Sequence, residues 1–420
     1  MSAETILNTY FIVFICYVAF EAILLLLNLK EAKSSNGKVP EFLAGQIDEE
    51  TFNRSVSYTV TKGKFALANH FYSALIIFVL IYFGYLGKWY NLWNSWLPNT
   101  PYTTSILYIL SLSLLMDILS YPFELYSIFK IEASYDFNRM TYKLWIMDKI
   151  KGYIISAIIG ALLFYAILWF VDVSGDMWWI YAVSFVIIFE LLLMYIYPAW
   201  IAPLFNKFTE LKNQNLKERI MSLAKKLDFK LADVYEMDGS KRTAHANAYF
   251  TGFGKNRRIV LFDTLCEMLN EDEIVAVLAH EIGHQKKKHI LKQLCLSCFV
   301  MFVMFWAMNC VLHYQPFFEA FGFSTTCAIG VLAIMSFIAS PIFYFLTPLT
   351  SILSRRFEYQ ADEFSAKACD GSKYLISALI ALSKKSLSNY LPHPFYTFFH
   401  YSHPALRERL AALKKFDNNQ

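Results

Sequence analysis

The sequence predicts an all-α integral membrane protein of seven transmembrane helices that carries a small α+β unit on its cytoplasmic side. Three observations lead to this fold class. Of the 420 residues, 56% are hydrophobic and only 17% are charged, whereas an ordinary soluble domain is about 45–50% apolar and about 25% charged. Seven apolar stretches are long enough to cross a bilayer. Lysine and arginine concentrate in alternate connections between these stretches.

A helix that crosses a bilayer needs about 20 mostly apolar residues. On this criterion we expect spans at roughly 6–28, 66–86, 103–123, 153–172, 177–201, 291–313 and 327–350. We do not expect the first stretch to be a cleaved signal peptide. It lacks a preceding basic region, its apolar run is too long, and Glu21 lies within it.

The basic residues of the connections predict the orientation. The connections 30–64 and 126–151 are rich in lysine and arginine, whereas the connection after the second span holds only Lys88 and VDVSGD holds neither type. The last span runs directly into Arg355 and Arg356. Because basic connections stay in the cytoplasm, the N-terminus should lie outside and the segments 204–290 and 351–420 inside.

Ionisable residues within or near the spans predict a water-containing interior. They are Glu21, His70, Asp117, Glu124 and Glu190. A charge in hydrocarbon costs several kcal/mol unless it faces protein or water. The formal net charge of +4 is too small to indicate a nucleic-acid partner, and seven scattered cysteines form no disulfide framework.

The two polar segments predict the α+β unit. NLKERIMSLAKKLDF at 215–229 has helical periodicity, and ADVYEM at 232–237 and RRIVLFD at 257–263 have the composition of strands. ANAYF at 246–250 is a third short strand that we expect at a sheet edge. The runs 364–387 and 404–416 should be helical.

The motif H-E-x-x-H indicates the chemistry. Asn270 and Glu273 form a predicted capping box that opens a helix, and His280, Glu281 and His284 follow on it. A spacing of four places both imidazoles on one helix face, where they can share Zn²⁺. The metal lowers the pKa of a bound water towards ~7, and Glu281 can take its proton. The alternative is a helix with two surface histidines.

A catalytic zinc needs a third protein ligand and leaves one position for water. Glu358 and Asp362 lie four apart after the last span, so they share a helix face. Glu358 can complete a His₂Glu set, and Asp362 can accept the free N–H of a ligand histidine and fix its tautomer. The alternatives are a solvated acidic face that includes Glu363, and a ligand role for His289, which lies off the face of His284.

Six blocks in order carry a resemblance to a known family. They are PFELYSIFKIEASYDFN at 122–138, YPAWIAPLFNKFTELK at 197–212, DGSKRTAHANAYFTGFGKNRRIVLFDTL at 238–265, AVLAHEIGH at 276–284, RRFEYQADEFS at 355–365 and YSHPALRERL at 401–410. With these blocks the sequence resembles the type I CaaX prenyl proteases, the integral-membrane zinc proteases that also process yeast a-factor and human prelamin A.

The resemblance implies a barrel of seven helices around a large chamber, with a gluzincin-like zinc metalloprotease domain at its cytoplasmic side. It implies one Zn²⁺ per chain, held by His280, His284 and Glu358. The general base of the family corresponds to Glu281, and an aspartate that supports a ligand corresponds to Asp362. We count Asp362 among the catalytic candidates.

The resemblance also implies residues that hold the substrate. Asn247, Ala248 and Tyr249 match an edge strand that pairs with the peptide backbone, as in β-augmentation. His403 matches a residue that reaches the substrate carbonyl, where it can stabilise an oxyanion. Arg409 matches one that reaches a carboxylate, which suits its bidentate fork. The alternative for His403 and Arg409 is a capped, solvated tail helix.

These expectations divide the chain into four parts. Residues 1–203 form a membrane domain of five helices, 204–290 the metalloprotease part with H-E-x-x-H, 291–350 two further membrane helices, and 351–420 the rest of the metalloprotease domain. We expect a monomer that cleaves peptides or proteins, chiefly those with a prenylated C-terminal cysteine. Its membrane is either that of the endoplasmic reticulum or a bacterial plasma membrane, since the chain ends in NNQ without a dibasic retrieval signal.

Two alternatives for the function remain at this point. One is a general quality-control zinc protease that resembles the bacterial heat-shock membrane proteases. The other is a transporter with a polar chamber and an incidental H-E-x-x-H, but we find no internal repeat of the kind common in transporters.

Overall fold

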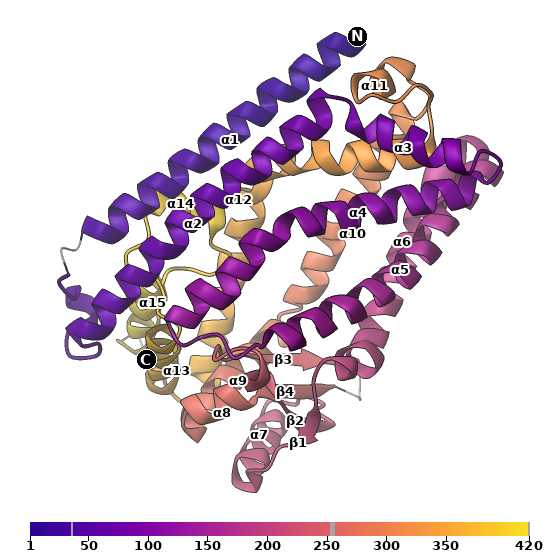
Figure 1. Cartoon of the computed structure of the whole chain (residues 1–420). Coiled ribbons are helices and arrows are strands. Elements are labelled where there is room, and N and C mark those ends of the chain that lie inside the picture. The colour runs from indigo at the N-terminus through magenta and orange to yellow at the C-terminus, as the bar shows by residue number, and fades with distance from the viewer. Residues whose placement is uncertain (35–36, 253–256, 419–420) are drawn as a thin grey trace.

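The computed structural model describes residues 1–34, 37–252 and 257–418. Long helices form a ring, and a compact unit of shorter helices and a sheet lies at one end of it (Figure 1). The long helices are α1 (Ala3–Ser34), α2 (Glu49–Tyr82), α4 (Pro101–Tyr126), α5 (Tyr142–Val173), α6 (Trp178–Ile196), α10 (His289–Val311) and α12 (Ala328–Ala368). Helix α4 continues into the π-helical Ser127–Glu132 and α6 into the π-helical Tyr197–Ile201.

The predicted number of membrane spans is confirmed, because seven helices of the described chain are long and apolar enough to cross a bilayer. Their ends differ from those expected. Helix α2 begins at Glu49 rather than near residue 66, and it ends at Tyr82 rather than near residue 86. Helix α12 has 41 residues, about 60 Å, which is twice the hydrocarbon thickness of about 30 Å. Apolar composition marks only the part of a helix that lies in lipid, so the polar extensions were not predicted.

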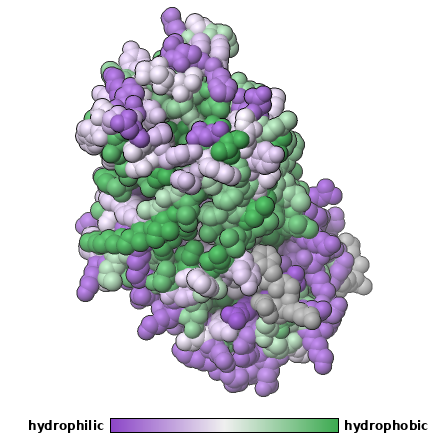
Figure 2. All heavy atoms as spheres, turned by 90° about the vertical axis from the view of Figure 1, so that its right-hand side faces the viewer, coloured by the Kyte–Doolittle hydropathy of each residue, from purple (hydrophilic) through white to green (hydrophobic). Residues whose placement is uncertain are grey.

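Along α4, α5, α6 and α10 the ring is one helix thick. In the most apolar 18-residue stretch of each span that contains α4, α5, α6 or α10, only 11% of the residues are buried. A helix inside a solid bundle would bury a whole face. These helices instead contact their neighbours along their sides and expose both an outer and an inner face. A broad hydrophobic band separates two hydrophilic ends on one side of the molecule (Figure 2). The predicted fold class, a membrane barrel around a chamber that carries a small α+β domain, is confirmed.

Most of the ionisable residues predicted within the spans have polar partners. Glu21 Oε2 accepts a hydrogen bond of 2.5 Å from Tyr344 and lies 3.0 Å from His400 Nε2. Lys149 Nζ lies 3.1 Å from Asp117 and 2.9 Å from Glu124. These pairs lower the cost of placing charge at membrane depth. They also fasten α1 to α12, and α4 to α5.

Two short helices close the end of the barrel farther from the sheet. They are α3 (Tyr85–Trp96) and α11 (Gln315–Ala320), and neither was predicted. Helix α3 touches the turn after α11 directly, since a Cβ atom on Gly87 of α3 would lie 1.9 Å from the carbonyl oxygen of Gly322. Gly322 has a φ of +85°, a conformation that L side chains rarely adopt. Glycine at both positions therefore permits the close approach.

The small unit is built on a four-stranded sheet in the order β1-β2-β4-β3. Its strands are β1 (Phe208–Glu210), β2 (Asp233–Met237), β3 (Ala248–Thr251) and β4 (Arg258–Phe262). Strands β2 and β4 run parallel, and β1 and β3 pair with them antiparallel. The three predicted strands are confirmed, with β3 at an edge, while the three-residue β1 was missed.

Helices cover the inner face of this sheet. Val234, Ile259 and Leu261 are fully buried there, against Ile220 of α7 and Leu278 of α9. The remaining helices of the unit are α7 (Gln214–Lys226), α8 (Asp263–Met268), α9 (Glu271–Lys286), α13 (Lys373–Lys385), α14 (Pro394–His400) and α15 (Leu406–Asn418). The helices predicted at 215–229 and 404–416 correspond to α7 and α15.

Candidate active site

Helix α9, which carries the H-E-x-x-H motif, begins with the predicted capping box. The Glu273 amide donates to Asn270 Oδ1 at 3.0 Å, and the Asn270 amide donates to Glu273 Oε2 at 2.9 Å. Ile274 and Leu278 then pack against the sheet, and Ala279 lies in a second apolar cluster. This packing fixes the rotation of α9 about its axis, and so the direction in which its polar face points.

Three side chains predicted as metal ligands converge from two helices. His280 Nε2 and His284 Nε2 of α9 lie 3.1 Å apart. Glu358 of α12 places Oε2 3.5 Å from His280 Nε2 and Oε1 3.3 Å from His284 Nε2. The Glu358 side chain is only 4% exposed. Residues 74 positions apart, from 284 to 358, therefore form one buried cluster that could hold a metal ion.

The spacing of these atoms fits a tetrahedral metal site. Metal–ligand bonds of about 2.0–2.2 Å in a tetrahedron place neighbouring ligand atoms about 3.3–3.6 Å apart. The three separations are 3.1, 3.3 and 3.5 Å. Glu358 Oε2 is also buried. His403 Nδ1 lies 2.7 Å from it, but no described residue gives it a hydrogen bond of good geometry, and buried polar atoms normally have partners. A cation between the ligands would satisfy it.

The field at this cluster favours positive charge. Burial by itself lowers the pKa of His280, but its contacts with Asp362 and Glu358 outweigh burial and raise that pKa above its usual value. Protonation would be one way to supply the missing charge, and a divalent cation is another. Two imidazoles with one carboxylate are a donor set that suits zinc.

Asp362 lies where it can support the cluster. Its Oδ1 lies 2.8 Å from His280 Nδ1, on the side of the ring away from Glu358. An N–H at Nδ1 leaves the lone pair at Nε2 for a metal. Arg409 of α15 holds this aspartate with two hydrogen bonds, from Nε at 2.9 Å and from one terminal nitrogen at 2.5 Å. Only 12% of the Arg409 side chain is exposed.

His403 and Glu281 are the more accessible members of the cluster. His403 precedes α15, and its Nδ1 lies 2.7 Å from Glu358 Oε2 while 63% of its side chain is exposed. Glu281 follows His280 directly on α9 and is half-buried. Both can therefore meet a substrate that approaches the three ligand atoms.

The predicted substrate strand lies beside this helix. Ala248 pairs with Leu261 and Tyr249 with Val260, and within the described part of the chain β3 has a partner strand on this side only. Phe250 packs in the cluster that holds Ala279 of α9. The outer edge of β3 is the one position in the described sheet that offers backbone groups next to the H-E-x-x-H helix. Asn247 precedes this strand, and its carbonyl accepts from the Phe262 amide at 3.0 Å.

The structure assigns His289 a place that was not predicted. It lies outside the group of three ligand atoms, yet its Nδ1 lies 3.0 Å from His284 Nδ1. Its Nε2 lies 2.9 Å from Gln360 Oε1, its ring stacks on Phe357, and it is 1% exposed. His289 is therefore placed to orient His284, as Asp362 is placed to orient His280.

Periodicity could not predict this contact because α9 does not continue to residue 289. Lys288 adopts a left-handed conformation with a φ of +56°, and α10 begins at His289 in a new direction. The only signal in the sequence is a third histidine five residues after the motif.

We expect His289→Ala to weaken metal binding and activity by about 10–100-fold, the usual effect of losing a residue that orients a ligand. His289→Asn should recover part of the loss, since its amide can bond to the same nitrogen of His284. Metal content after dialysis against a mild chelator, together with kcat, measures both effects. His313→Ala, an exposed histidine beyond the other end of α10, is the control. Equal metal affinity in His289→Ala and wild type would contradict the assignment.

Comparisons with known proteins agree with this geometry. Residues 28–207 match the family model described as the CAAX prenyl protease N-terminal domain with five membrane helices, and residues 210–417 match peptidase family M48. Similar curated proteins include "CAAX prenyl protease 1 homolog" of Arabidopsis thaliana, 37% identical over 89% of this chain and 90% of that protein. The human homologue is 36% identical over 90% and 88%.

The yeast protein "CAAX prenyl protease 1" of Saccharomyces cerevisiae is 36% identical over 91% of this chain and 89% of its own. Among solved structures, the crystal structure of S. mikatae Ste24p superposes with a TM-score of 0.91. It is 33% identical and covers 98% of this chain and 99% of that chain. The similarity therefore extends over both the membrane barrel and the unit that carries the H-E-x-x-H helix.

Proposed function

The chain belongs to peptidase family M48, among the CAAX prenyl proteases, and from this premise we propose that its metal is zinc and its substrates carry a prenylated cysteine near their C-terminus. It is a membrane metalloendopeptidase. The observation that supports zinc is the buried cluster of His280, His284 and Glu358, with separations of 3.1–3.5 Å between ligand atoms. The names of the relatives support the CaaX substrate.

The proposed mechanism assigns each group by its position. Zinc, when bound, polarises a carbonyl and makes water a nucleophile near neutral pH. Glu281 takes the proton of the attacking water and returns it to the leaving amine. His403 donates a hydrogen bond to the carbonyl oxygen as negative charge develops there. Asp362 holds the Nδ1 proton of His280, and the edge of β3 at Asn247, Ala248 and Tyr249 aligns the peptide backbone.

Arg409 has two possible partners in this scheme. Its fork is engaged by Asp362, and its other terminal nitrogen lies 3.7 Å from Glu358 Oε2. We assign it first to hold Asp362. Binding of a substrate carboxylate would use the remaining donors of the same guanidinium. We also propose that the chain divides into domains after residues 203, 290 and 350.

A pair of peptides tests the function. The full-length chain in detergent micelles should cleave a synthetic CaaX peptide with a thioether-linked isoprenoid after its cysteine, and cleave the S-methyl twin more slowly. One zinc per chain should be present by elemental analysis. Failure to cleave the prenylated peptide in a zinc-loaded preparation would overturn the proposed substrate class.

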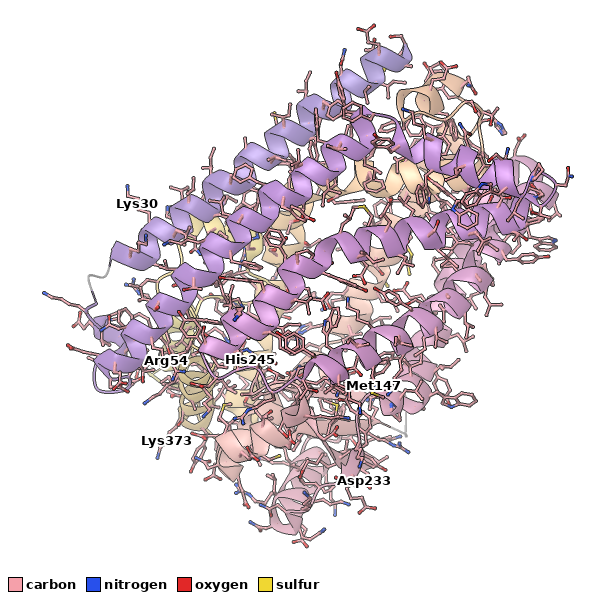
Figure 3. The ribbon with its side chains drawn as sticks, viewed as in Figure 1. Lys30, Arg54, Met147, Asp233, His245 and Lys373 are labelled. Atoms are coloured by element: carbon pink, nitrogen blue, oxygen red, sulfur yellow. The ribbon has the colours of Figure 1, made fainter. Side chains whose placement is uncertain are left out.

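The proposed orientation places the active site in the cytoplasm. Arg54 of α2 and Lys373 of α13 lie at the end of the molecule that carries the sheet (Figure 3), and basic connections stay on the cytoplasmic side. Helix α10 and the apolar first part of α12 separate Glu281 from Glu358, which lies in the later part of α12. An even number of spans returns the chain to the same side, as a shared metal requires.

We expect cysteine labelling to confirm this orientation. In a background without native cysteines, positions near Gly37 and Asn419 should react only from the cytoplasmic side, and positions near Ser174 and Gln315 only from the opposite side. Asn419 lies outside the described residues. Labelling at Gln315 from the cytoplasm would show that α10 and α12 do not both cross the membrane.

A further inference from the structure

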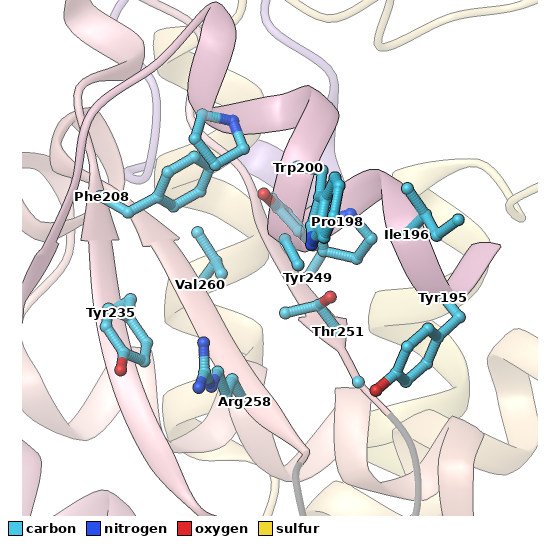
Figure 4. Close-up of a pocket in the computed structure, with 13 residues that line it drawn as sticks. Tyr195, Ile196, Pro198, Trp200, Phe208, Tyr235, Tyr249, Thr251, Arg258 and Val260 are labelled. Carbon is cyan, nitrogen blue, oxygen red and sulfur yellow. The ribbon is translucent and has the colours of Figure 1, made fainter. Parts of the chain in front are cut away.

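A pocket of about 540 Å³ lies between the end of α6 and the outer face of the sheet (Figure 4). Pro198 and Trp200 line it from the π-helical end of α6. Tyr235, Tyr249 and Val260 line it from three strands. Its volume falls within the range of roughly 300–1,000 Å³ that is typical of small-molecule sites. It lies on the sheet face opposite to the helices, and the mechanism above does not use it.

The chemistry of the lining favours an apolar ligand. Alternation along β4 turns Ile259 and Leu261 into the core and leaves Val260 facing the pocket. Among the described lining residues the only charged side chain is Arg258, which is exposed and lies over the Tyr235 ring at 5.2 Å. An arginine in that position keeps its charge in water at the rim. Apart from the hydroxyl groups of Thr251 and the tyrosines, the interior is therefore formed by aromatic and aliphatic groups.

The pocket is continuous with the strand proposed to bind the substrate. Tyr249 and Thr251 of β3 line it, whereas Phe250 between them packs towards α9. A peptide that pairs with the edge of β3 extends the sheet by one strand, and its side chains alternate between the two faces. Every second substrate side chain then projects from the same face as Tyr249, into or beside the pocket.

The other wall is the end of a membrane helix. Helix α6 belongs to a candidate span, and its aromatic end is open, with Trp200 76% exposed. Aromatic residues of this kind occur at the interface between lipid and water. An apolar chain that leaves the bilayer surface beside α6 can therefore enter the pocket without crossing water.

We propose that this pocket binds the isoprenoid chain on the substrate cysteine. The proposal rests on the proposed function, in which that cysteine precedes the cleaved bond and so lies on the strand paired with β3. It explains how one site holds both a polar peptide and a lipid. The peptide follows the edge of β3 to the metal cluster, and the lipid turns to the outer face of the sheet. A bilayer lipid is the competing occupant.

The test compares two substitutions at one position. Thr251→Phe fills the pocket with a residue suited to a strand, and Thr251→Val keeps the size of the side chain. Each full-length variant is assayed with the prenylated CaaX peptide and its S-methyl twin, and the ratio of the two kcat/KM values is the readout. Trp96→Ala removes an exposed tryptophan of α3 at the far end of the barrel, and serves as the control.

We expect Thr251→Phe to lower the preference for the prenylated peptide by about tenfold or more, through KM, because several methylene groups lose their apolar contacts. Thr251→Val and Trp96→Ala should keep the wild-type preference. A wild-type preference in Thr251→Phe would overturn the pocket and leave the proposed function standing, and so would an equal loss with both peptides in a variant that still binds its metal. Absence of cleavage of either peptide by the wild type would instead overturn the proposed function.

A second measurement covers the case in which Thr251→Phe does not fold. A photoreactive isoprenoid on the uncleaved peptide, bound to Glu281→Gln protein, should crosslink to the segment 195–200 or to β3. Crosslinks confined to α1 and α2, or crosslinks that excess unlabelled peptide does not remove, would show that the chain lies elsewhere or that the site takes bilayer lipid.

Discussion

Glu281→Gln should bind its metal as the wild type does and lose about 10²–10⁴-fold in kcat, the range of a general base. Glutamine has nearly the same shape as glutamate, and the three candidate ligand atoms belong to His280, His284 and Glu358. The amide cannot take a proton from the attacking water. Metal content by elemental analysis and turnover of the prenylated peptide are the two measurements.

Glu363→Gln is the matched control for this substitution. Glu363 is an exposed glutamate on α12 that pairs with Lys367 one turn along the same helix, so its loss should change kcat little. An unfolded Glu281→Gln protein would lose both metal and activity, which distinguishes misfolding from a missing base. Stoichiometric metal with near-wild-type turnover in Glu281→Gln would remove Glu281 from the mechanism.

The local part of the candidate site could be predicted because its geometry follows from helical spacing. Asn270 and Glu273 start α9, and four residues separate His280 from His284. The same spacing relates Glu358 to Asp362 on α12. Such spacings determine which residues share a helix face. A correct helix prediction therefore also predicts which side chains lie together. That α9 and α12 meet was inferred from the need for a third ligand, and the structure brings them together.

The remaining contacts depend on chain directions that no pattern encodes. The turn at Lys288 brings His289 back to His284, and the packing of α15 brings Arg409 to Asp362. The short β1, α11 and α14 are set by tertiary packing and have too few residues for a periodic signal. In the sequence, the residues on the outer face of the sheet show only the alternation of side chains that any strand has. The pocket forms because the end of α6 lies over this face, and the sequence does not predict that position.

Glu358→Ala should lose its metal during dialysis against a mild chelator that leaves wild-type protein loaded. The substitution removes one of three ligand atoms and leaves two imidazoles, which bind a divalent cation far more weakly. Activity should fall with the metal content. Asp362→Ala should weaken metal binding less, by about 10–100-fold, because it removes a contact to His280 Nδ1 and no ligand atom.

Asp362→Ala has a second consequence that must be separated from the first. Arg409 is largely buried and makes two hydrogen bonds to Asp362, and breaking a buried ion pair from one side destabilises a protein by about 3–5 kcal/mol. Asp362→Asn keeps an oxygen that can accept a hydrogen bond from Arg409. This variant should therefore be more stable than Asp362→Ala, while its metal affinity should be the same as that of Asp362→Ala. Thermal unfolding of the metal-free proteins measures stability independently of metal binding. If Glu358→Ala kept its metal as the wild type does, the third ligand would lie elsewhere, and His289, already 3.0 Å from His284, would be examined first.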